Sequence, residues 1–355
     1  MTKYLFDGHK LIWHMDRVHK HYKLGKRIPP IHIDIGVTKL CNARCVYCYG
    51  IFQKLSGDII PKSTLMRLFK DAPTCGVKSL AIIGDGDPTL NSGIYDAITV
   101  GKDSGLDIAF GTNGILLDDD KLLCLLSSCA WLRFNLSAVD KQRYLDIHGV
   151  DKWGQVKGNI IRAAELKSRY GLKCTIGLQM VLIPDCVEQV IPEAQFALDT
   201  GVDYFVIKQF SDPQCDEMSR FSLTWYDNPE VLDILKRAEA MSTDKTAIIP
   251  KWNTISSKGV RPYDHCVDCP LIFQISGNGK AYPCGYLFGD DRYCYGDLNK
   301  QSLGEILYSE HYWGVIKYMR ERFDVHKDCA GCCRHDHSNK FIWGYLHPPV
   351  HLNFI

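Results

Sequence analysis

The sequence of 355 residues lacks any apolar run long enough to cross a lipid bilayer. It also lacks an excess of either charge, since 42 Lys and Arg stand beside 41 Asp and Glu for a formal net charge of +1. Balanced charge gives no electrostatic reason to bind nucleic acid. Lys3, Asp7, Lys10 and Asp16 interrupt any apolar core of a secretory signal near the start. We therefore expect a cytoplasmic protein with neither a membrane nor a nucleic acid as partner.

Cysteine, in contrast, is abundant, with 16 residues that fall into two kinds. In a reducing compartment, clustered cysteines indicate metal binding and scattered ones indicate core packing. Ten cysteines lie in three groups, at 41–48, 266–294 and 329–333. The other six are isolated, and we interpret them as small apolar residues of the core. They are Cys75, Cys124, Cys129, Cys174, Cys186 and Cys215.

Short β-rich runs alternate with helical patterns through the first part of the chain. Such alternation predicts βα units with parallel strands. Six strands are fewer than a closed eight-stranded barrel needs, so we predict an α/β fold with a partial (β/α)6 TIM-like barrel. The expected strands are 31–37, 79–83, 106–112, 131–137, 173–182 and 204–210. Gly76, Gly105, Gly171 and Gly201 each follow a predicted helix, where a left-handed cap is favoured.

The pattern divides the chain into four segments. We predict a helical lead-in over 1–30, the partial barrel over 31–210, a connecting region over 211–262 and a small cysteine-rich domain over 263–355. The last segment contains a hairpin-like stretch over 273–282, with a turn at Gly277-Asn278-Gly279.

Cys41, Cys45 and Cys48 have the spacing C-x3-C-x2-C directly after the first predicted strand. That edge is where βα folds place their chemistry. Three neighbouring thiolates can hold three irons of a cubane cluster and leave the fourth iron open. The alternative is a zinc knuckle, but zinc in a structural site needs four protein ligands, and the next cysteine is Cys75.

The spacing, its place after strand one and the aromatic Tyr47 before Cys48 resemble the radical S-adenosylmethionine (SAM) superfamily. The resemblance implies a [4Fe–4S] cluster whose open iron is chelated by SAM. It implies that one-electron reduction cleaves SAM to a 5′-deoxyadenosyl radical, which takes a hydrogen atom from the substrate. An electron donor such as flavodoxin or ferredoxin is then expected.

The resemblance extends to residues expected to contact SAM. Gly84-Asp85-Gly86-Asp87-Pro88 follows strand two, where the family carries Gly-Gly-Glu-Pro and receives the SAM amino group; here Asp87 keeps the carboxylate with a shorter reach. Asn113 and Ser137 match polar positions near the SAM ribose. Gln179 lies on the strand that presents groups to SAM. Taken singly, Asn113, Ser137 and Gln179 fit equally well as polar residues of turns or strand ends. The cofactor-binding prediction is Tyr47, Gly86, Asp87, Asn113, Ser137 and Gln179.

The C-terminal cysteines, in the order C-x2-C, C-x9-G-x4-C and C-x2-C, resemble the SPASM and twitch extensions of radical SAM enzymes. These extensions carry auxiliary iron–sulfur clusters. No cysteine follows Cys333, which favours one auxiliary [4Fe–4S] cluster. The predicted ligands are Cys269, Cys284, Cys329 and Cys332, with Cys266 as an alternative and Cys294 and Cys333 as spare candidates. Structural zinc is the alternative for this group. His265, His335 and His337 lie near these cysteines, and we favour solvated loop positions for them over roles as cluster ligands or as contacts of the ligands.

The sequence does not identify a catalytic base, and three functions stay open. The first is a two-electron oxidation, or a related tailoring, of a small polar molecule such as a sugar or cyclitol. It rests on the short region before strand one, which leaves no room for a separate peptide-recognition domain. The second is modification of a peptide or protein by thioether formation, epimerisation or oxidation of Cys or Ser. The third is a non-catalytic iron–sulfur or zinc module.

Overall fold

The computed structural model describes residue 4 and residues 8–211, 222–257, 259–330 and 333–354. Its centre is one ten-stranded sheet in the order β10-β9-β8-β1-β2-β3-β4-β5-β6-β7. Neighbouring strands are parallel from β8 through β1 to β7, whereas the β8–β9 and β9–β10 pairs are antiparallel. Their bounds are β1 His32–Ile35, β2 Ser79–Ile82, β3 Asp107–Thr112, β4 Trp131–Asn135, β5 Thr175–Leu182, β6 Tyr204–Gln209, β7 Ala247–Pro250, β8 Ile272–Ile275, β9 Lys280–Tyr282 and β10 Gly296–Asp297.

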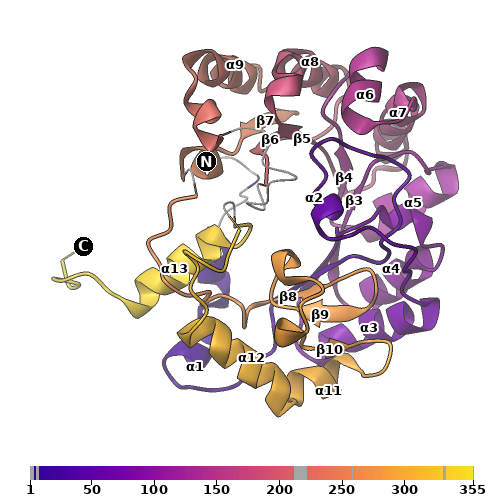
Figure 1. The fold of residues 1–355 in the computed structure, drawn as a ribbon. Helices are drawn as coiled ribbons and strands as arrows, with labels where there is room; N and C mark the ends of the chain where they lie inside the picture. The colour runs from indigo at the N-terminus through magenta and orange to yellow at the C-terminus, as the bar shows by residue number, and fades with distance from the viewer. Residues whose placement is uncertain (1–3, 5–7, 212–221, 258, 331–332, 355) are drawn as a thin grey trace.

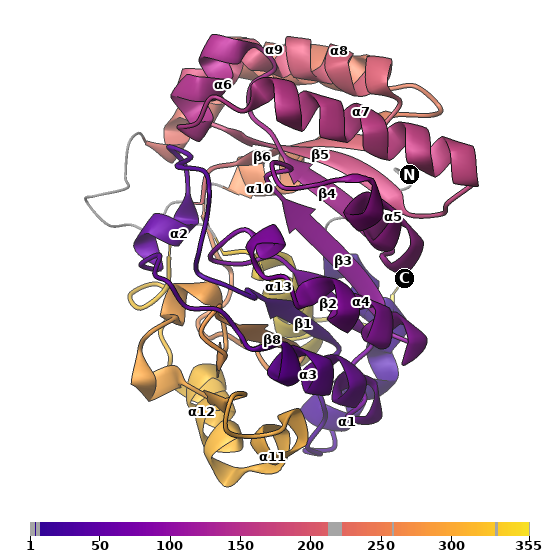
Figure 2. The same cartoon turned by 90° about the vertical axis from the view of Figure 1, so that its right-hand side faces the viewer.

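Helices cover the outer face of this sheet (Figure 1). Figure 2 shows α4 and α5 lying across β2 to β4, with α6 to α9 following along β4 to β7. The helices that follow β8 to β10 lie at this end of the sheet, where α11 contacts α3 (Figure 1). The helical bounds are α1 Met15–Tyr22, α2 Tyr49–Phe52, α3 Lys62–Thr74, α4 Ile94–Asp103, α5 Asp119–Ser128, α6 Lys141–His148, α7 Trp153–Tyr170, α8 Val190–Thr200, α9 Pro229–Ala240, α10 Trp252–Ser257, α11 Leu303–Tyr308, α12 Glu310–Glu321 and α13 Asp336–Leu346.

The predicted partial barrel is confirmed, because the sheet ends at β7 and β10 and does not close. All six predicted strands are present, as β1 to β6. The sheet has more strands than the six predicted, since β7 and β8 extend it on either side. It therefore continues across the boundaries predicted at 210 and 263, and the division into four segments stays a prediction.

Local sequence signals explain where the helices begin and end. The Asp118 side chain accepts a hydrogen bond from the Lys121 amide and caps α5. Gly171 and Gly201 end α7 and α8 with φ of 60° and 67°, a conformation that favours glycine. The predicted left-handed caps are therefore present. The predicted hairpin is present too, because β8 and β9 pair antiparallel around the turn at Gly277 to Gly279.

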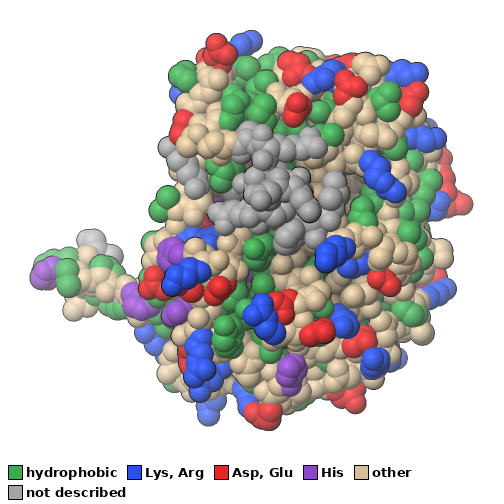
Figure 3. Space-filling model, viewed as in Figure 1, with side chains coloured by type: hydrophobic (Ala, Val, Ile, Leu, Met, Phe, Trp, Pro, Cys, Tyr) green, Lys and Arg blue, Asp and Glu red, His purple; other side chains and the backbone are tan. Residues whose placement is uncertain are grey.

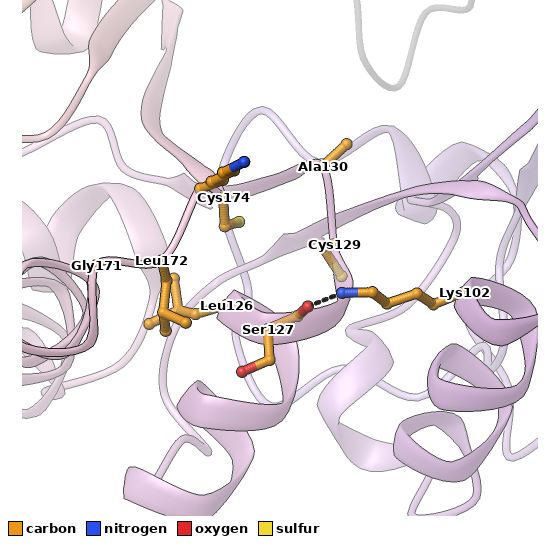
Figure 4. Close-up of a pocket in the computed structure, with 9 residues that line it drawn as sticks. Lys102, Leu126, Ser127, Cys129, Ala130, Gly171, Leu172 and Cys174 are labelled. Carbon is orange, nitrogen blue, oxygen red and sulfur yellow. Dashed lines mark hydrogen bonds between the residues drawn. The ribbon is translucent and has the colours of Figure 1, made fainter.

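Three of the five isolated cysteines in the described part of the chain are core residues, as predicted, and two are only half-buried. Cys129, Cys174 and Cys186 are buried, and Cys75 and Cys124 are half-buried. Cys215 lies outside the described residues. Cys129 and Cys174 line a cavity of about 310 Å³ together with Lys102, whose ammonium group donates to the Ser127 carbonyl (Figure 4). This cavity lies at the amino ends of β4 and β5, opposite the edge where the strands end.

The molecular surface mixes both charges. Figure 3 shows Lys, Arg, Asp and Glu side chains interspersed over one face. The C-terminal extension projects from the left side of the molecule in this view, and its Val350, Leu352 and Phe354 side chains are exposed. Among the described residues, no helix combines the length and the apolar character that crossing a membrane requires.

Candidate metal centres

The first three cysteines lie in the loop between β1 and α2, at the carboxyl edge of the sheet. The end of α6 holds this loop in place. The Arg44 amide donates to the His148 carbonyl and the Val46 amide to the Ile147 carbonyl, both at 2.9 Å. Gly149 ends α6 with φ of 68°, and a Cβ there would lie 2.8 Å from the Arg44 carbonyl oxygen. The cysteine loop is thus supported by backbone contacts.

The three thiols form one electrostatic group. Burial, followed by the neighbouring Cys48 and Cys41, raises the pKa of Cys45 far above its usual value. Within the described residues, no three His, Cys, Asp or Glu side chains are placed to hold a single metal ion. In a cubane, each cysteine binds a different iron, so the sulfurs need not converge on one point. Three half-buried thiols on one loop suit a group that carries positive charge and binds thiolates.

His148 contacts the cysteine loop with its side chain as well, and sequence reasoning missed it. Its Nδ1 lies 3.2 Å from Cys45 Sγ, and its Nε2 accepts a hydrogen bond from the Ser137 amide at 3.1 Å. Burial lowers the pKa of His148 to about 3, so the ring is neutral. Tyr47 lies edge-on to this imidazole, with 5.9 Å between ring centroids. No local signal connects His148 with Cys45, because 103 residues separate them.

Asp87 connects the ends of β2 and β3. Its buried carboxylate accepts hydrogen bonds from the Asn113 amide at 2.7 Å, the Thr89 amide at 3.0 Å and the Thr112 hydroxyl at 3.0 Å. Burial raises the pKa of Asp87, and these donors oppose the shift. Gly86 allows the close approach of this turn to the cysteine loop, because a Cβ there would lie 2.3 Å from the Leu40 carbonyl oxygen. The predicted turn therefore lies beside the cysteine loop, with Asp87 engaged by the protein.

The structure also places the other predicted SAM residues at this edge. Asn113 Nδ2 donates to Asn42 Oδ1 at 2.7 Å and lies 3.9 Å from Cys41 Sγ, so Asn113 contacts the cysteine loop. Gln179 donates to Asn135 Oδ1 at 3.0 Å. Ser137 is fully buried, and its hydroxyl oxygen accepts from the Val181 amide at 3.2 Å. Their roles toward SAM stay predictions.

A second group of cysteines forms beside β8 and α13. A hydrogen bond with Cys333 lowers the pKa of Cys329, while burial and Cys333 raise the pKa of Cys284 to about 12. A hydrogen bond with Cys269 raises the pKa of Cys266 well above its usual value, and Cys333 adds to this shift. Cys332 lies outside the described residues. The described residues therefore bring together Cys266, Cys269, Cys284, Cys329 and Cys333.

Buried polar side chains surround this second group. Asn339 Oδ1 accepts from the Val267 and Asp268 amides at 2.7 and 3.1 Å, and its Nδ2 donates to Asp268 at 2.9 Å. His335 Nδ1 lies 3.4 Å from Asp268. The interpretation of His335 as a solvated loop residue is wrong, because its side chain is buried between Asp268 and Gln274. A place for His335 beside the cysteines was the less favoured alternative, because its partners Asp268 and Gln274 approach it only in the folded chain.

Tyr49 links the two groups of cysteines. It directly follows Cys48, and burial together with Cys284, Cys329 and Cys333 raises the pKa of its hydroxyl far above the usual value. Nearby, Gln53 Nε2 donates to the Gly285 carbonyl at 3.0 Å. The segment that directly follows Cys48 therefore lies beside the second cysteine group.

The concave face of the sheet carries charged side chains. Asp34 on β1 accepts from Arg334 at 2.6 Å and from Gln274 on β8 at 3.1 Å. Burial lowers the pKa of Arg133 on β4, and Tyr204 and Asp34 oppose this shift. Because β2 and β3 separate β1 from β4, Asp34 and Arg133 can influence each other only across the concave face. This polar face lies inside the barrel, between the two cysteine groups and the amino ends of the strands.

An open α/β barrel with three cysteines on the loop after its first strand, and a cysteine-rich region beside it, defines a class of iron–sulfur proteins. Residues 35–192 match the family described as the radical SAM superfamily, and residues 266–333 match the SPASM iron–sulfur cluster-binding domain. The chain belongs to the radical SAM superfamily and carries a SPASM domain. It binds SAM at a [4Fe–4S] cluster, and its C-terminal region carries auxiliary iron–sulfur cluster binding.

Several proteins are similar over most of the chain. A probable GTP 3′,8-cyclase of Sulfurisphaera tokodaii is 26% identical over 274 residues, which is 74% of this chain and 83% of the relative. A tungsten-containing aldehyde ferredoxin oxidoreductase cofactor-modifying protein of Pyrococcus furiosus is 19% identical over 86% of this chain and 88% of its own. The crystal structure of Streptococcus suis SuiB bound to precursor peptide SuiA gives a TM-score of 0.65 at 17% identity, covering 94% of this chain and 78% of SuiB.

Proposed function

We propose that the protein is a radical SAM oxidoreductase that removes two electrons from a small polar molecule. When bound, the N-terminal cluster and SAM supply a 5′-deoxyadenosyl radical, and the auxiliary cluster supplies an acceptor for the second electron. Cys41, Cys45 and Cys48 hold the first cluster. Cys284, Cys329 and Cys333, together with Cys266 or Cys269, are the described candidates for the second.

The observation that carries this proposal is the polar concave face between the cysteine groups. Asp34, Arg133 and Gln274 offer one carboxylate, one guanidinium and one amide within the barrel. Groups of this kind orient a small molecule that carries several hydroxyl or other polar groups. A substrate held there lies inside the sheet, where the barrel wall excludes bulk water from the reacting carbon.

The protein's own residues have separate tasks at the first centre. Asp87 and Asn113 fix the turns after β2 and β3 against the cysteine loop, so that the edge is rigid before SAM binds. Gln179 and Asn135 present a hydrogen-bonded amide pair on the neighbouring strands. Gly86 forms part of the same edge, in a turn where any side chain would clash with the Leu40 backbone.

The names of two relatives add support for a small-molecule substrate. GTP 3′,8-cyclase is named for a reaction of a nucleotide, and the Pyrococcus protein is named for modifying a cofactor. Both are similar to this chain across most of its length. A cyclisation can proceed without net loss of electrons from the substrate. An experiment must therefore distinguish such a reaction from the proposed two-electron oxidation.

The test is anaerobic reconstitution with iron, sulfide, SAM and a reductant or flavodoxin. Formation of 5′-deoxyadenosine would support radical chemistry, and its absence with a full iron complement would support a non-catalytic iron–sulfur module. Candidate substrates labelled with deuterium then identify the substrate by transfer of deuterium into 5′-deoxyadenosine. With the unlabelled substrate, a product about two mass units lighter than the substrate supports oxidation, whereas a product of unchanged mass contradicts it.

Peptide modification is the second candidate, because SuiB shares this fold and its structure holds a precursor peptide. The same deuterium assay with peptides that contain Cys or Ser distinguishes the two classes. Transfer from a peptide, with none from sugars or cyclitols, would contradict the small-molecule proposal.

A further inference from the structure

We propose that His148 is a positioning residue for the N-terminal cluster: its imidazole donates a hydrogen bond to the Cys45 sulfur and makes that cluster easier to reduce. The inference concerns the cluster that the family binds and does not depend on the identity of the substrate. His148 does not belong to the cysteine motif, and it lies at the last position of α6.

The direction of this hydrogen bond follows from the second ring nitrogen. The Ser137 amide is a donor and lies 3.1 Å from His148 Nε2, so Nε2 must accept and cannot carry a proton. A neutral imidazole then carries its proton on Nδ1. Nδ1 lies 3.2 Å from Cys45 Sγ, so the Nδ1–H group donates to the sulfur. The Ser137 backbone thereby selects the tautomer.

The surroundings hold the ring in this orientation. Tyr144 stacks on the imidazole with 4.3 Å between ring centroids, and the His148 side chain is fully buried. The His148 carbonyl also accepts from the Arg44 amide, one residue before Cys45. The donor and the sulfur are therefore held together by side-chain and backbone hydrogen bonds between α6 and the cysteine loop.

A hydrogen bond to a ligating sulfur withdraws electron density from the cluster and raises its reduction potential. The effect matters at a centre that must be reduced before it can act. The protein thus places a neutral donor, rather than a positive charge, against one of three thiolates.

The experiment measures the midpoint potential of the N-terminal cluster in the reconstituted full chain without substrate. Electron paramagnetic resonance distinguishes the two clusters, because only the N-terminal signal changes when SAM is added. In His148→Phe, which keeps an aromatic ring but has no donor, we expect the reduced-to-oxidised ratio at a fixed potential to fall about tenfold, or about 59 mV for one electron. His148→Asn keeps a donor near the position of Nδ1 and should shift less.

Tyr144→Phe is the matched control, since it changes the neighbouring ring without removing the donor, and its midpoint should equal that of the wild type. An unchanged midpoint in His148→Phe with full iron content would overturn the proposal. If His148→Phe fails to assemble its cluster, ¹⁵N NMR of the wild-type protein without iron decides. A proton on Nδ1 of His148 supports the proposal, and a proton on Nε2 overturns it. A shifted midpoint in an enzyme that oxidises no small molecule would leave this inference standing and remove only the proposed function.

Discussion

The two cysteine groups of this protein are built in different ways. The first occupies eight consecutive residues, 41–48, and lies on a single loop supported by the backbone of α6. The second is assembled from three separate segments, 266–269, 284 and 329–333, around β8, β9 and α13. Short-range spacing fixes the first group. Buried side chains such as Asp268 and Asn339 hold the second group, so it depends on long-range contacts of the folded chain.

The largest effect should come from removing the first group. In a Cys41/Cys45/Cys48→Ala variant, we expect iron to fall from about eight to about four atoms per chain, since each cubane holds four. Formation of 5′-deoxyadenosine should cease, because SAM has no open iron to bind. Iron and sulfide analysis with a SAM-cleavage assay provides the measurement. Full iron content in the variant would contradict the assignment of these three ligands.

The second group can be tested with adjacent cysteines. Cys333 interacts with Cys329 and Cys284, so Cys333→Ala should lose the auxiliary cluster while 5′-deoxyadenosine formation persists. Cys332→Ala is the matched comparison, because the sequence predicted Cys332 as the ligand. Cys294→Ala serves as a control, since the Cys294 thiol donates to the Gly296 carbonyl. Loss of iron in Cys332→Ala alone would restore the sequence-based ligand set.

Side-chain support should matter for the stability of both groups. Asp87→Ala leaves buried donors of Thr89, Thr112 and Asn113 without their acceptor, at a cost of about 3 kcal/mol in the free energy of unfolding. Chemical denaturation of the iron-free protein would measure it. A loss below about 0.5 kcal/mol would show that water replaces the carboxylate.

Asn339→Ala should cost about 2 kcal/mol, because it leaves the Val267 and Asp268 amides unpaired. Unlike Asp87→Ala, it should also lower the iron content of the second group and leave the first group intact. Iron analysis on both variants measures this contrast. Equal iron loss at both centres would contradict the independence of the two groups.

The smallest effect concerns pH. Burial works to raise the pKa of Asp34, but Arg334 and His32 outweigh it and hold the pKa below the usual range. A carboxylate with a depressed pKa adds stability above its unfolded pKa of about 4, and this stability is lost as pH falls through the folded value. The free energy of unfolding of the wild type should therefore exceed that of Asp34→Asn by on the order of 1 kcal/mol at pH 7. This difference should become smaller between about pH 4 and pH 2. Denaturation at several pH values tests this, and a constant gap would contradict it.

The sequence predicted those parts of the fold that depend on local patterns. The six strands β1 to β6 follow from β-rich runs between helical segments, and Gly171 and Gly201 mark helix ends. It did not predict β7, a four-residue strand ending at Pro250 in a segment interpreted as a connection. Nor did it predict that β8 continues the barrel sheet. A hairpin signal indicates that β8 and β9 pair, but it does not indicate that β8 also pairs with β1.

The same distinction holds for the site. The spacing of Cys41, Cys45 and Cys48 is a local signal, and the fold places these residues on one loop. His148 and His335 gave no comparable signal, because each acts through residues that are distant in the sequence. A buried histidine at the end of a helix resembles any core residue until its partner is known.

The pairing of β8 with β1 has a consequence for how the chain folds during synthesis. β1 pairs with β2 on one side, but its other edge pairs with β8, and the bonded side chains of Asp34 and Gln274 are 240 residues apart. Until the ribosome has made β8, the first strand keeps an open edge that can recruit other strands. Nascent chains released before residue 276 should therefore aggregate, because β8 covers the edge of a strand that was made about 240 residues earlier.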